Sequence, residues 1–549
     1  MSLYKTIDGL LLRDMAMAGN ALLESNRETV DALNVFPVPD GDTGTNMSLT
    51  MQSAIREINS KEFLRLDEAA SALAKGALKG ARGNSGVITS QLLRGFAKAV
   101  SGQEKVTPAQ FAQAMKAGSD LAYKAVMKPK EGTILTVARV TAEEALKQAE
   151  KAPDDFEALF QTILTSGQDI LEKTPDMLPV LKQANVVDSG GTGLMYIYTG
   201  YAAVIQGKTV EEILADLAAQ AEADEEEDLD DLTHLYCTKF SIVNLSEDCE
   251  ESDIDSLRRR LNRIGSHVRV KGDLQRVDIH VDTNHPGTAI EDGLEIGEII
   301  DVSIENKQEL KRKRDGAEQT PAKVAHAEPE KEHGMVAVSL GEGFSKIFHD
   351  LTVDVVVEGG QTMNPSIDDI LSAIYACKAK TVYVFPNNGN VILAAQQAAD
   401  LAENVQVYVI PTKNVAMGIA AAVAFQPDVV GELNARHMEE AAEHVKTGTV
   451  TYAIRDSEYN DIHIHQGDII GLHNGKIEYS GANVHDVAMK MMEAVVDQDS
   501  ELITVYYGAD TTQADAEQLA EDLGAVYPDC DVECHSGGQP LYYYLISVE

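Results

Sequence analysis

Two carboxylates stand two residues apart in a glycine-rich loop near the start of the chain. They are Asp40 and Asp42, and the pattern that follows predicts a helix over residues 47–58. Oxygen ligands this close together suit Mg²⁺, which takes one or two carboxylates and fills its other positions with water and nucleotide phosphates. Asn34 adds a neutral oxygen from the other side of the loop. The spacing therefore predicts a magnesium–nucleotide loop with Asp40 and Asp42 as its catalytic carboxylates.

The residues directly after the carboxylates favour phosphate binding. Unpaired N–H groups and the helix dipole attract anions to a helix N-terminus, and four residues would lie there: Thr43, Gly44, Thr45 and Asn46. An ordinary turn followed by a threonine cap also explains this pattern. Three further loops, each before an expected helix, favour the nucleotide interpretation, although each alone would pass for a connection. Their candidate nucleotide-binding residues are Asn84, Ser85, Gly86, Thr133, Asp188 and Gly190.

The composition excludes several classes of protein. The 549 residues carry a formal net charge of −42, so the mean field repels nucleic acid and anionic membranes. The chain has no apolar run of about 18 residues and no basic start of the signal-peptide kind, so we expect neither an integral membrane protein nor an exported one. The five cysteines are scattered and odd in number, which indicates a reducing, cytoplasmic setting.

Two polar segments divide the chain into three parts. Residues 219–232 form an acidic linker whose like charges stay solvated, and residues 306–334 form a flexible linker with too few apolar residues to pack. Residues 1–218 show the three- and four-residue apolar spacing of an all-helical domain. Residues 233–305 follow the order β-α-β-β-α-β of a small α+β domain. Residues 335–549 alternate strands and helices, which predicts an α/β domain and a multidomain protein overall.

The first part resembles the nucleotide-binding domain of bacterial dihydroxyacetone kinases, the DhaL type. Asp40 and Asp42 match the last two of that family's three acidic ligands, and its phosphate and nucleotide loops fall on the candidate residues already named. The resemblance implies an α-helical barrel that holds ATP or ADP through two Mg²⁺ ions. Asn34 falls near the first acidic ligand, Pro39 replaces a glycine and Ser189 replaces a proline. The third protein ligand of the metal therefore stays open.

Over its whole length the chain resembles bacterial fatty acid kinase A. The likeness lies in Asn-Val-Phe-Pro-Val-Pro-Asp-Gly-Asp-Thr-Gly-Thr-Asn at residues 34–46, in Gly-Asn-Ser-Gly at 83–86 and in the three-part layout. The resemblance implies that this chain binds ATP while a separate fatty-acid-binding protein, of the FakB or DegV type, presents the fatty acid. The product would be an acyl phosphate. It also implies a DegV-like C-terminal domain that docks this partner, and a homodimer.

A second metal site is predicted in the middle part. Cys237 lies in one expected strand, and His280 and Asp282 share a face of another. Such side chains can bind Zn²⁺ when their strands are neighbours. The resembling family carries a Cys and a His-x-His pair here, implicated in metal binding, so Asp282 replaces the second histidine and His285 is a further candidate. A buried thiol beside polar strand residues explains the pattern without a metal.

Two polar loops in the last part follow expected strands, over residues 358–366 and 385–390. Doubly wound sheets bind ligands at such loops, but ordinary connections in which Ser366 and Asn390 cap the next helices explain them better. We expect this part to bind a partner rather than to catalyse. Near the C-terminus, Cys530, Cys534 and His535 fall in what the pattern suggests is a loop, and core or accessible thiols explain them better than a metal does.

Two alternative functions use the same residues. A small-molecule kinase acting on dihydroxyacetone or a related polyol would need a ketone-binding domain with a nucleophilic histidine, which the sequence does not show. A non-enzymatic scaffold that holds ADP permanently would need the same nucleotide loops, and only turnover separates it from a kinase. The sequence contains neither a Gly-x-x-x-x-Gly-Lys-Ser/Thr loop nor a His-Arg-Asp catalytic loop, so P-loop and protein-kinase functions lack their main supports.

Overall fold

The structure of the protein is a computed structural model with two compact units. One comprises residues 1–217 and 325–549, and the other comprises residues 218–324. The structure describes residues 3–35, 41–221, 234–243, 245, 251–272, 276–307, 329–360, 363–453, 457–459, 462–465, 467–474 and 476–549. Asp40, predicted as a metal ligand and catalytic carboxylate, lies outside the described residues.

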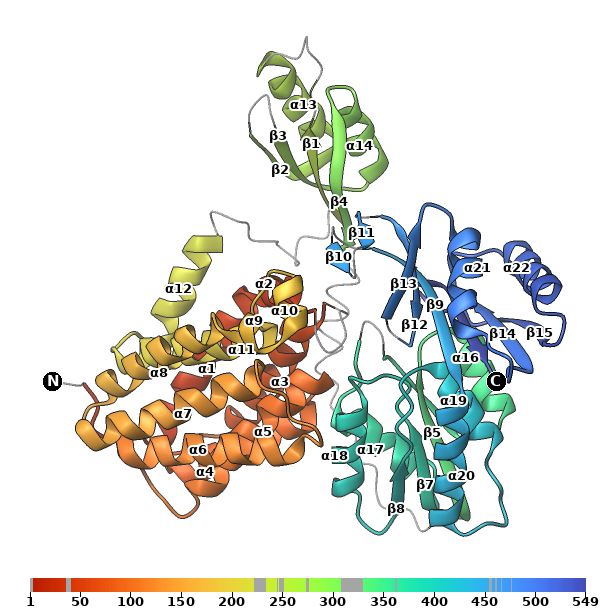
Figure 1. The fold of residues 1–549 in the computed structure, drawn as a ribbon. Helices are drawn as coiled ribbons and strands as arrows, with labels where there is room; N and C mark the ends of the chain where they lie inside the picture. Colours follow the sequence, from red (N-terminus) through yellow and green to blue (C-terminus); the bar gives the residue numbers. More distant parts are fainter. Residues whose placement is uncertain are drawn as a thin grey trace. The chain divides into compact units, whose positions relative to one another are not determined.

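The N-terminal part of the first unit is helical, as predicted (Figure 1). Its helices are α1 (Gly9–Ser25), α2 (Arg27–Ala32), α3 (Thr43–Ile58), α4 (Leu66–Gly80), α5 (Gly83–Ala99), α6 (Pro108–Ala125), α7 (Ile134–Lys151), α8 (Phe156–Leu171), α9 (Thr174–Met177), α10 (Pro179–Gln183), α11 (Ser189–Ile205) and α12 (Val210–Ala221). Most of them pack around one apolar core, and Leu178 and Leu181 form a small separate cluster with Val35. Helices α1 and α11 touch backbone to backbone, because a Cβ on Gly200 would meet the amide nitrogen of Gly19 at 2.4 Å.

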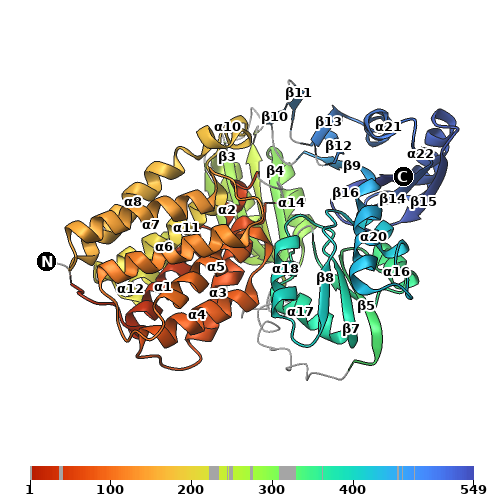
Figure 2. The same ribbon diagram turned by 60° about the horizontal axis from the view of Figure 1, so that its bottom comes forward.

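The C-terminal part, which we call the C-terminal lobe, opens with a four-stranded parallel sheet of order β6-β5-β7-β8. Its strands are β5 (Lys331–Ser339), β6 (Val355–Glu358), β7 (Ala379–Phe385) and β8 (Gln406–Val409). Its helices are α16 (Glu342–Asp350), α17 (Ile367–Ala376), α18 (Ile392–Leu401), α19 (Val415–Val423) and α20 (Gly431–His444). Figures 1 and 2 show α17 and α18 on one face of this sheet and α19 and α20 on the other.

Alternation along the strands of this sheet fills two separate cores. On β5, Met335 and Ala337 face the core that includes α19 and α20. Val336 and Val338 face the opposite core, together with α17 and α18. Successive strand residues point to opposite faces, so a strand buried on both sides must be apolar throughout. That continuous apolar run is the pattern that predicted these strands from the sequence.

A second sheet of six strands completes the lobe, in the order β13-β12-β9-β16-β14-β15. The strands are β9 (Lys446–Tyr452), β12 (Ile469–His473), β13 (Lys476–Gly481), β14 (Leu502–Tyr507), β15 (Asp531–Ser536) and β16 (Tyr542–Val548), with helices α21 (Val484–Val495) and α22 (Gln513–Val526) and a small pair, β10 (Ser457–Tyr459) with β11 (Ile462–Ile464). The prediction of a loop around Cys534 is wrong. Residues 531–536 pair in parallel with β14 as an edge strand. Many side chains of this strand are polar and exposed, so its sequence lacks the apolar pattern that predicts a strand.

The second unit has the predicted α+β order. It comprises β1 (Tyr236–Val243), α13 (Glu251–Ile264), β2 (Gly265–Gly272), β3 (Arg276–Thr283), α14 (Pro286–Leu294) and β4 (Glu298–Asn306). The antiparallel sheet has the order β2-β3-β1-β4. The multidomain fold class of a helical part, an α+β part and an α/β part is thus confirmed. Among the described helices, no segment is long and apolar enough to span a bilayer.

Candidate functional site

Four helices begin at the four loops that the sequence singled out. They are α3, α5, α7 and α11, and none carries an acidic residue in its first turn. In three of the four the N-cap residue makes no side-chain capping bond, and only α11 is capped by its own N-cap residue, Asp188. N–H groups at several helix N-termini make a region of positive potential. An anion with several negative oxygens, such as a nucleotide phosphate, suits that region.

Direct contacts bring these loops together. A Cβ on Gly83, whose φ is +55°, would meet the Asn46 amide nitrogen at 2.5 Å, so the second loop lies directly against the first. Ser189 Oγ donates to Thr43 Oγ1 at 3.3 Å, which joins the first loop to the fourth. The Asp188 carboxylate accepts a backbone hydrogen bond from Ile134, which joins the fourth loop to the third.

The described part of the metal loop centres on Asp42. This residue is the N-cap of α3, makes no side-chain capping bond and is 6% exposed. The expectation that Thr43 or Thr45 caps this helix is wrong, because Asp31 supplies the bond instead. Its carboxylate accepts from the Thr45 amide at 3.0 Å and from Thr45 Oγ1 at 2.8 Å. Burial raises the pKa of Asp31, and the two bonds from Thr45 oppose that shift.

The other predicted residues differ in their exposure to solvent. Asn34, Gly44, Asn46, Gly86 and Gly190 are buried, while Asn84, Ser85 and Thr133 are partly exposed. Thr133 is the N-cap of α7, but its hydroxyl donates to the carbonyl of Lys130 at 2.9 Å rather than capping the helix. The residues present fit a divalent cation, because a buried carboxylate stands among neutral oxygen-bearing side chains, which are the ligands that Mg²⁺ prefers.

Asp188 makes the stability of the folded protein depend on pH. Its carboxylate accepts from the Gly191 amide at 2.7 Å, and burial raises its pKa from 3.8 to about 7. The folded protein therefore binds a proton between about pH 4 and pH 7 that the unfolded chain has already lost. This contribution to stability is complete below about pH 4 and is lost as the pH rises through about 7.

We expect Asp188→Asn to flatten the pH dependence of stability. Asparagine keeps the oxygen that caps Gly191 but cannot ionise. The free energy of unfolding, measured without nucleotide by chemical denaturation at pH 5 and pH 8, should fall more for the wild type than for the variant. Parallel pH profiles for the two proteins would show that Asp188 is not the titrating group.

Side chains of the C-terminal lobe lie against the same loops, within the first unit. Asn364 Nδ2 donates to Asp42 Oδ2, and Asn84 Nδ2 donates to Asn390 Oδ1 at 2.6 Å. Arg82 Nη1 donates to the Asn364 carbonyl at 2.8 Å.

Of the two helix caps predicted for this lobe, one is confirmed and one is wrong. Ser366 caps α17 with a full capping box, whereas Asn390 does not cap α18, whose N-cap is Val391.

The predicted zinc residues of the second unit form one cluster. The potential ligand atoms of Cys237, His280 and Asp282 all lie within 4.8 Å of one another, and all three residues are buried. Cys237 Sγ is 3.9 Å from His280 Nε2. His285 lies outside the cluster, exposed at the N-cap of α14. The donor types and distances thus suit Zn²⁺.

A buried lysine opposes a metal at this cluster. Lys307 Nζ lies 2.8 Å from Asp282 Oδ2, with the lysine side chain 1% exposed. Zn²⁺ held by a thiolate, an imidazole and a carboxylate would be electrically neutral, so a charged Lys307 would leave a positive charge buried. The charge balance therefore does not fit zinc while Lys307 keeps its place. Zinc binding stays a prediction, and we derive no chemical step from it.

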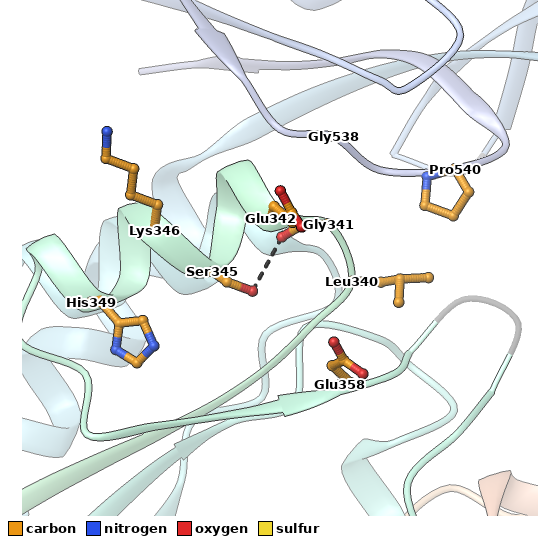
Figure 3. Close-up of a pocket in the computed structure, with 9 residues that line it drawn as sticks. All are labelled: Leu340, Gly341, Glu342, Ser345, Lys346, His349, Glu358, Gly538 and Pro540. Carbon is orange, nitrogen blue, oxygen red and sulfur yellow. Dashed lines mark hydrogen bonds between the residues drawn. The ribbon is translucent and has the colours of Figure 1, made fainter.

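Two pockets bear on where a fatty acid could be held. A surface pocket of about 680 Å³ in the C-terminal lobe is lined by Leu340, Gly341, Glu342, Ser345, Lys346, His349, Glu358, Gly538 and Pro540. Figure 3 shows the side chains of Glu342, Lys346, His349 and Glu358 around it, and Ser345 Oγ bonded to the Gly341 carbonyl. An apolar cavity among the N-terminal helices has only about 60 Å³. Neither pocket suits a long acyl chain, and neither includes the nucleotide loops.

Three family models match the chain. A DAK2 domain matches residues 37–203, a FakA-like middle domain matches residues 233–314, and a FakA-like C-terminal domain matches residues 334–549. The helical site thus belongs to a kinase-family domain, which implies nucleotide binding. The full succession of parts makes this chain a member of the FakA-like family, that of fatty acid kinase A. The resemblance stated from residues 34–46 is confirmed.

Similar proteins span the same length. Protein YloV of Bacillus subtilis is 40% identical over 553 residues, covering 99% of this chain and 100% of YloV. An uncharacterized protein of Staphylococcus saprophyticus is 38% identical, with 99% of each chain covered. A fatty-acid-binding DegV family protein from Thermus thermophilus aligns with a TM-score of 0.30 and 13% identity, over 40% of this chain and 99% of its own. A likeness at that score carries no argument about fold or partner.

Sequence reasoning missed three residues at the site. Asp31 stands three residues before Asn34 in the chain, so its acidic side chain near the loop was a signal for a further carboxylate there. Asn364 was inside a polar loop that the sequence flagged, but nothing local showed that it contacts Asp42. Arg82 is the first residue of the predicted phosphate loop, but no role was given to its side chain, which bonds across to the C-terminal lobe.

Proposed function

We propose that the protein phosphorylates a fatty acid carboxylate at the expense of ATP, giving an acyl phosphate, and that a separate fatty-acid-binding protein of the FakB or DegV type presents the fatty acid. The observation that carries this proposal is the contact among the N-termini of α3, α5 and α11 beside the buried Asp42, with α7 joined to α11 through Asp188. Membership of the FakA-like family supports the choice of acceptor.

The residues that bind the nucleotide would act by positioning its phosphates and neutralising their charge. The amides at the start of α5 would bind phosphate oxygens, whereas the Thr45 amide of α3 is already bonded to Asp31. Asp42 with Asp40 would hold Mg²⁺, which neutralises the charge on the phosphates. Asn84 and Ser85 would add polar contacts at the start of α5. Asp188, which links the third and fourth loops, would fix the position of α11 against α7.

The acceptor needs no general base. A fatty acid carboxylate is ionised at neutral pH, so its oxygen attacks the γ-phosphorus directly. One oxygen–phosphorus bond forms, the bond from the γ-phosphorus to the β–γ bridging oxygen breaks, and ADP leaves with the electron pair. No proton moves in this step, so the reaction depends on alignment and on charge stabilisation.

The acyl chain would belong to the partner protein. The pocket in the C-terminal lobe is lined largely by charged and small residues, and the cavity among the helices is too small. A long apolar chain needs an apolar cavity to leave water. We propose that the C-terminal lobe instead binds the partner, so that chain-length preference would reside in that second protein.

The test is reconstitution. Purified protein, ATP, Mg²⁺, a long-chain fatty acid and a bacterial fatty-acid-binding protein of the DegV type should together yield acyl phosphate, detected as a hydroxamate. Product that requires every component supports the proposal. Dihydroxyacetone phosphorylation without the partner would establish the polyol-kinase function instead. Tight ADP binding with no turnover of either substrate would establish the scaffold.

A further inference from the structure

The C-terminal lobe reaches the candidate metal loop through one buried side chain. Asn364 is 2% exposed, and its Nδ2 donates to the Asp42 carboxylate. Its other amide atom, Oδ1, is buried without a hydrogen-bond partner among the residues that the structure describes. A buried acceptor oxygen without a donor costs free energy. The same oxygen becomes favourable when a cation binds beside it.

The loop that carries Asn364 is held against the helical part of the unit. The guanidinium of Arg82 bonds the Asn364 carbonyl and lies 3.4 Å from the Asp369 carboxylate. The Ile367 amide donates to the Ala81 carbonyl at 3.1 Å. Ala81 and Val87 from the helical part share a core with Ile367 and Ile370 of α17. Asn364 is therefore fixed at the metal loop by packing as well as by its own bond.

A planar amide presents a donor on one side and an acceptor on the other. Without a cation, the N–H of Asn364 satisfies the negative charge of Asp42. With a cation on Asp42, an N–H directed there would be repelled, and a half-turn about the Cβ–Cγ bond brings Oδ1 to the same place. Amide oxygens are ordinary ligands of hard divalent cations. The rotation thus gives the metal an oxygen and moves the N–H groups of Asn364 to the place that Oδ1 held.

We propose that Asn364 of the C-terminal lobe supplies an oxygen ligand to the divalent cation of the nucleotide site, directly or through one water. This oxygen would be the third protein ligand that the sequence left open. Asn390 adds a second link, through its bond to Asn84. The docked lobe offers the Asn364 oxygen to the cation, and the bound cation in turn holds Asn364. Docking of the lobe and binding of Mg²⁺–nucleotide therefore favour each other. The inference rests on the proposed nucleotide site.

The test compares three variants of the full chain. Asn364→Leu keeps the size of the side chain and removes both polar atoms. Asn364→Asp keeps oxygen atoms but removes the N–H. Gln397→Leu is the matched control, because Gln397 of α18 accepts from Gln91 of α5 at 2.9 Å, which also joins the lobe to the helical part but touches no candidate nucleotide residue. Binding of Mg²⁺–ADP is measured by calorimetry, and binding of Mn²⁺ by the loss of its free paramagnetic signal.

We expect Asn364→Leu to weaken Mg²⁺–ADP and Mn²⁺ binding at least tenfold, and Gln397→Leu to change both less than twofold. Asn364→Asp should bind Mn²⁺ at least as tightly as the wild type, because it offers a charged oxygen. In Asn364→Asp, exchange protection of the Ile367 amide should fall without a cation, since two carboxylates then face each other, and should return with Mn²⁺. That protection shows whether the lobe is folded and docked in every variant.

Other outcomes would overturn the proposal. Unchanged affinity in Asn364→Leu would show that Asn364 is no ligand, and tighter nucleotide binding would show that the contact competes with the nucleotide. Weak Mn²⁺ binding by Asn364→Asp with the lobe docked would also exclude an oxygen ligand. Absence of Mg²⁺–ADP binding by the wild type would instead refute the nucleotide site, and with it the proposed function.

Discussion

Asp42→Asn should lower kcat/KM for acyl phosphate formation by about 1000-fold, or about 4 kcal/mol of transition-state stabilisation. The carboxylate is 6% exposed at the N-cap of α3, so the charge that would hold Mg²⁺ cannot be replaced by bulk water. Asparagine keeps the shape of the side chain and loses the charge. Phosphoryl transfer depends on neutralising phosphate charge, so the rate should fall more than nucleotide affinity, which the helix N-termini continue to support.

Asp31→Asn is the matched control for this prediction. Asp31 lies beside the same helix N-terminus, but its carboxylate is engaged with Thr45, so its charge stabilises the helix rather than facing a ligand. We expect this variant to lose less than tenfold in kcat/KM. The measurement is initial rate against Mg²⁺ concentration in the reconstituted assay. Asp42→Asn activity above about a tenth of the wild type would exclude Asp42 as a metal ligand.

Lys307→Met should destabilise the second unit by about 3–5 kcal/mol in metal-free buffer. Lys307 and Asp282 are almost completely buried, with their charged atoms 2.8 Å apart. Removing Lys307 takes away the cation that lies closest to the buried carboxylate of Asp282, and losing one partner of a buried pair costs about that much. The double variant Lys307→Met, Asp282→Asn should recover most of the loss, because it removes the buried charge entirely. Zn²⁺ should stabilise the single variant more than the wild type, because Lys307 no longer opposes the ion.

Hydrogen exchange of the β3 amides of Ile279 and Val281 measures the stability of this unit separately from the rest of the chain. Arg276→Met is the comparison within the same sheet, since Arg276 pairs with Asp278 at the surface, where the two side chains are 51% and 56% exposed. Such a pair contributes less than about 1 kcal/mol. Equal protection in Lys307→Met and Arg276→Met would show that the buried pair does not stabilise the sheet.

The sequence predicted the fold where its periodicity was strong. Long amphipathic helices and fully apolar parallel strands such as β5 and β7 carry their burial pattern in their own residues. The edge strand β15 does not, because only part of it is buried and its polar residues resemble those of a loop. Helix α20 was also missed, since its mix of Glu, Arg and His with few large apolar residues gave a weak pattern.

Only those parts of the site that lie close together in the sequence were predicted. The loops around Thr43, Asn84 and Asp188 are each rich in glycine and each precede a helix, so their residue types suggested a nucleotide. The contact of Asn364 with Asp42 joins residues 322 positions apart, and no local pattern encodes it. Lys307 was placed in a linker by its charged neighbours, although its own side chain is buried against Asp282. Partners at such distances follow from the fold and not from spacing.

The first unit is built from two stretches of chain with another unit between them, and this has a consequence for how the protein is made. Val87 packs in the same core as Val336, but 249 residues, 336 minus 87, separate their synthesis. At about 5–20 residues per second, the ribosome needs roughly 10–50 s to supply that partner. The newly made helices wait through this interval with the apolar residues around Ala81 and Val87 in water. The speed of translation, and any chaperone that covers this surface meanwhile, therefore influence the yield of folded protein.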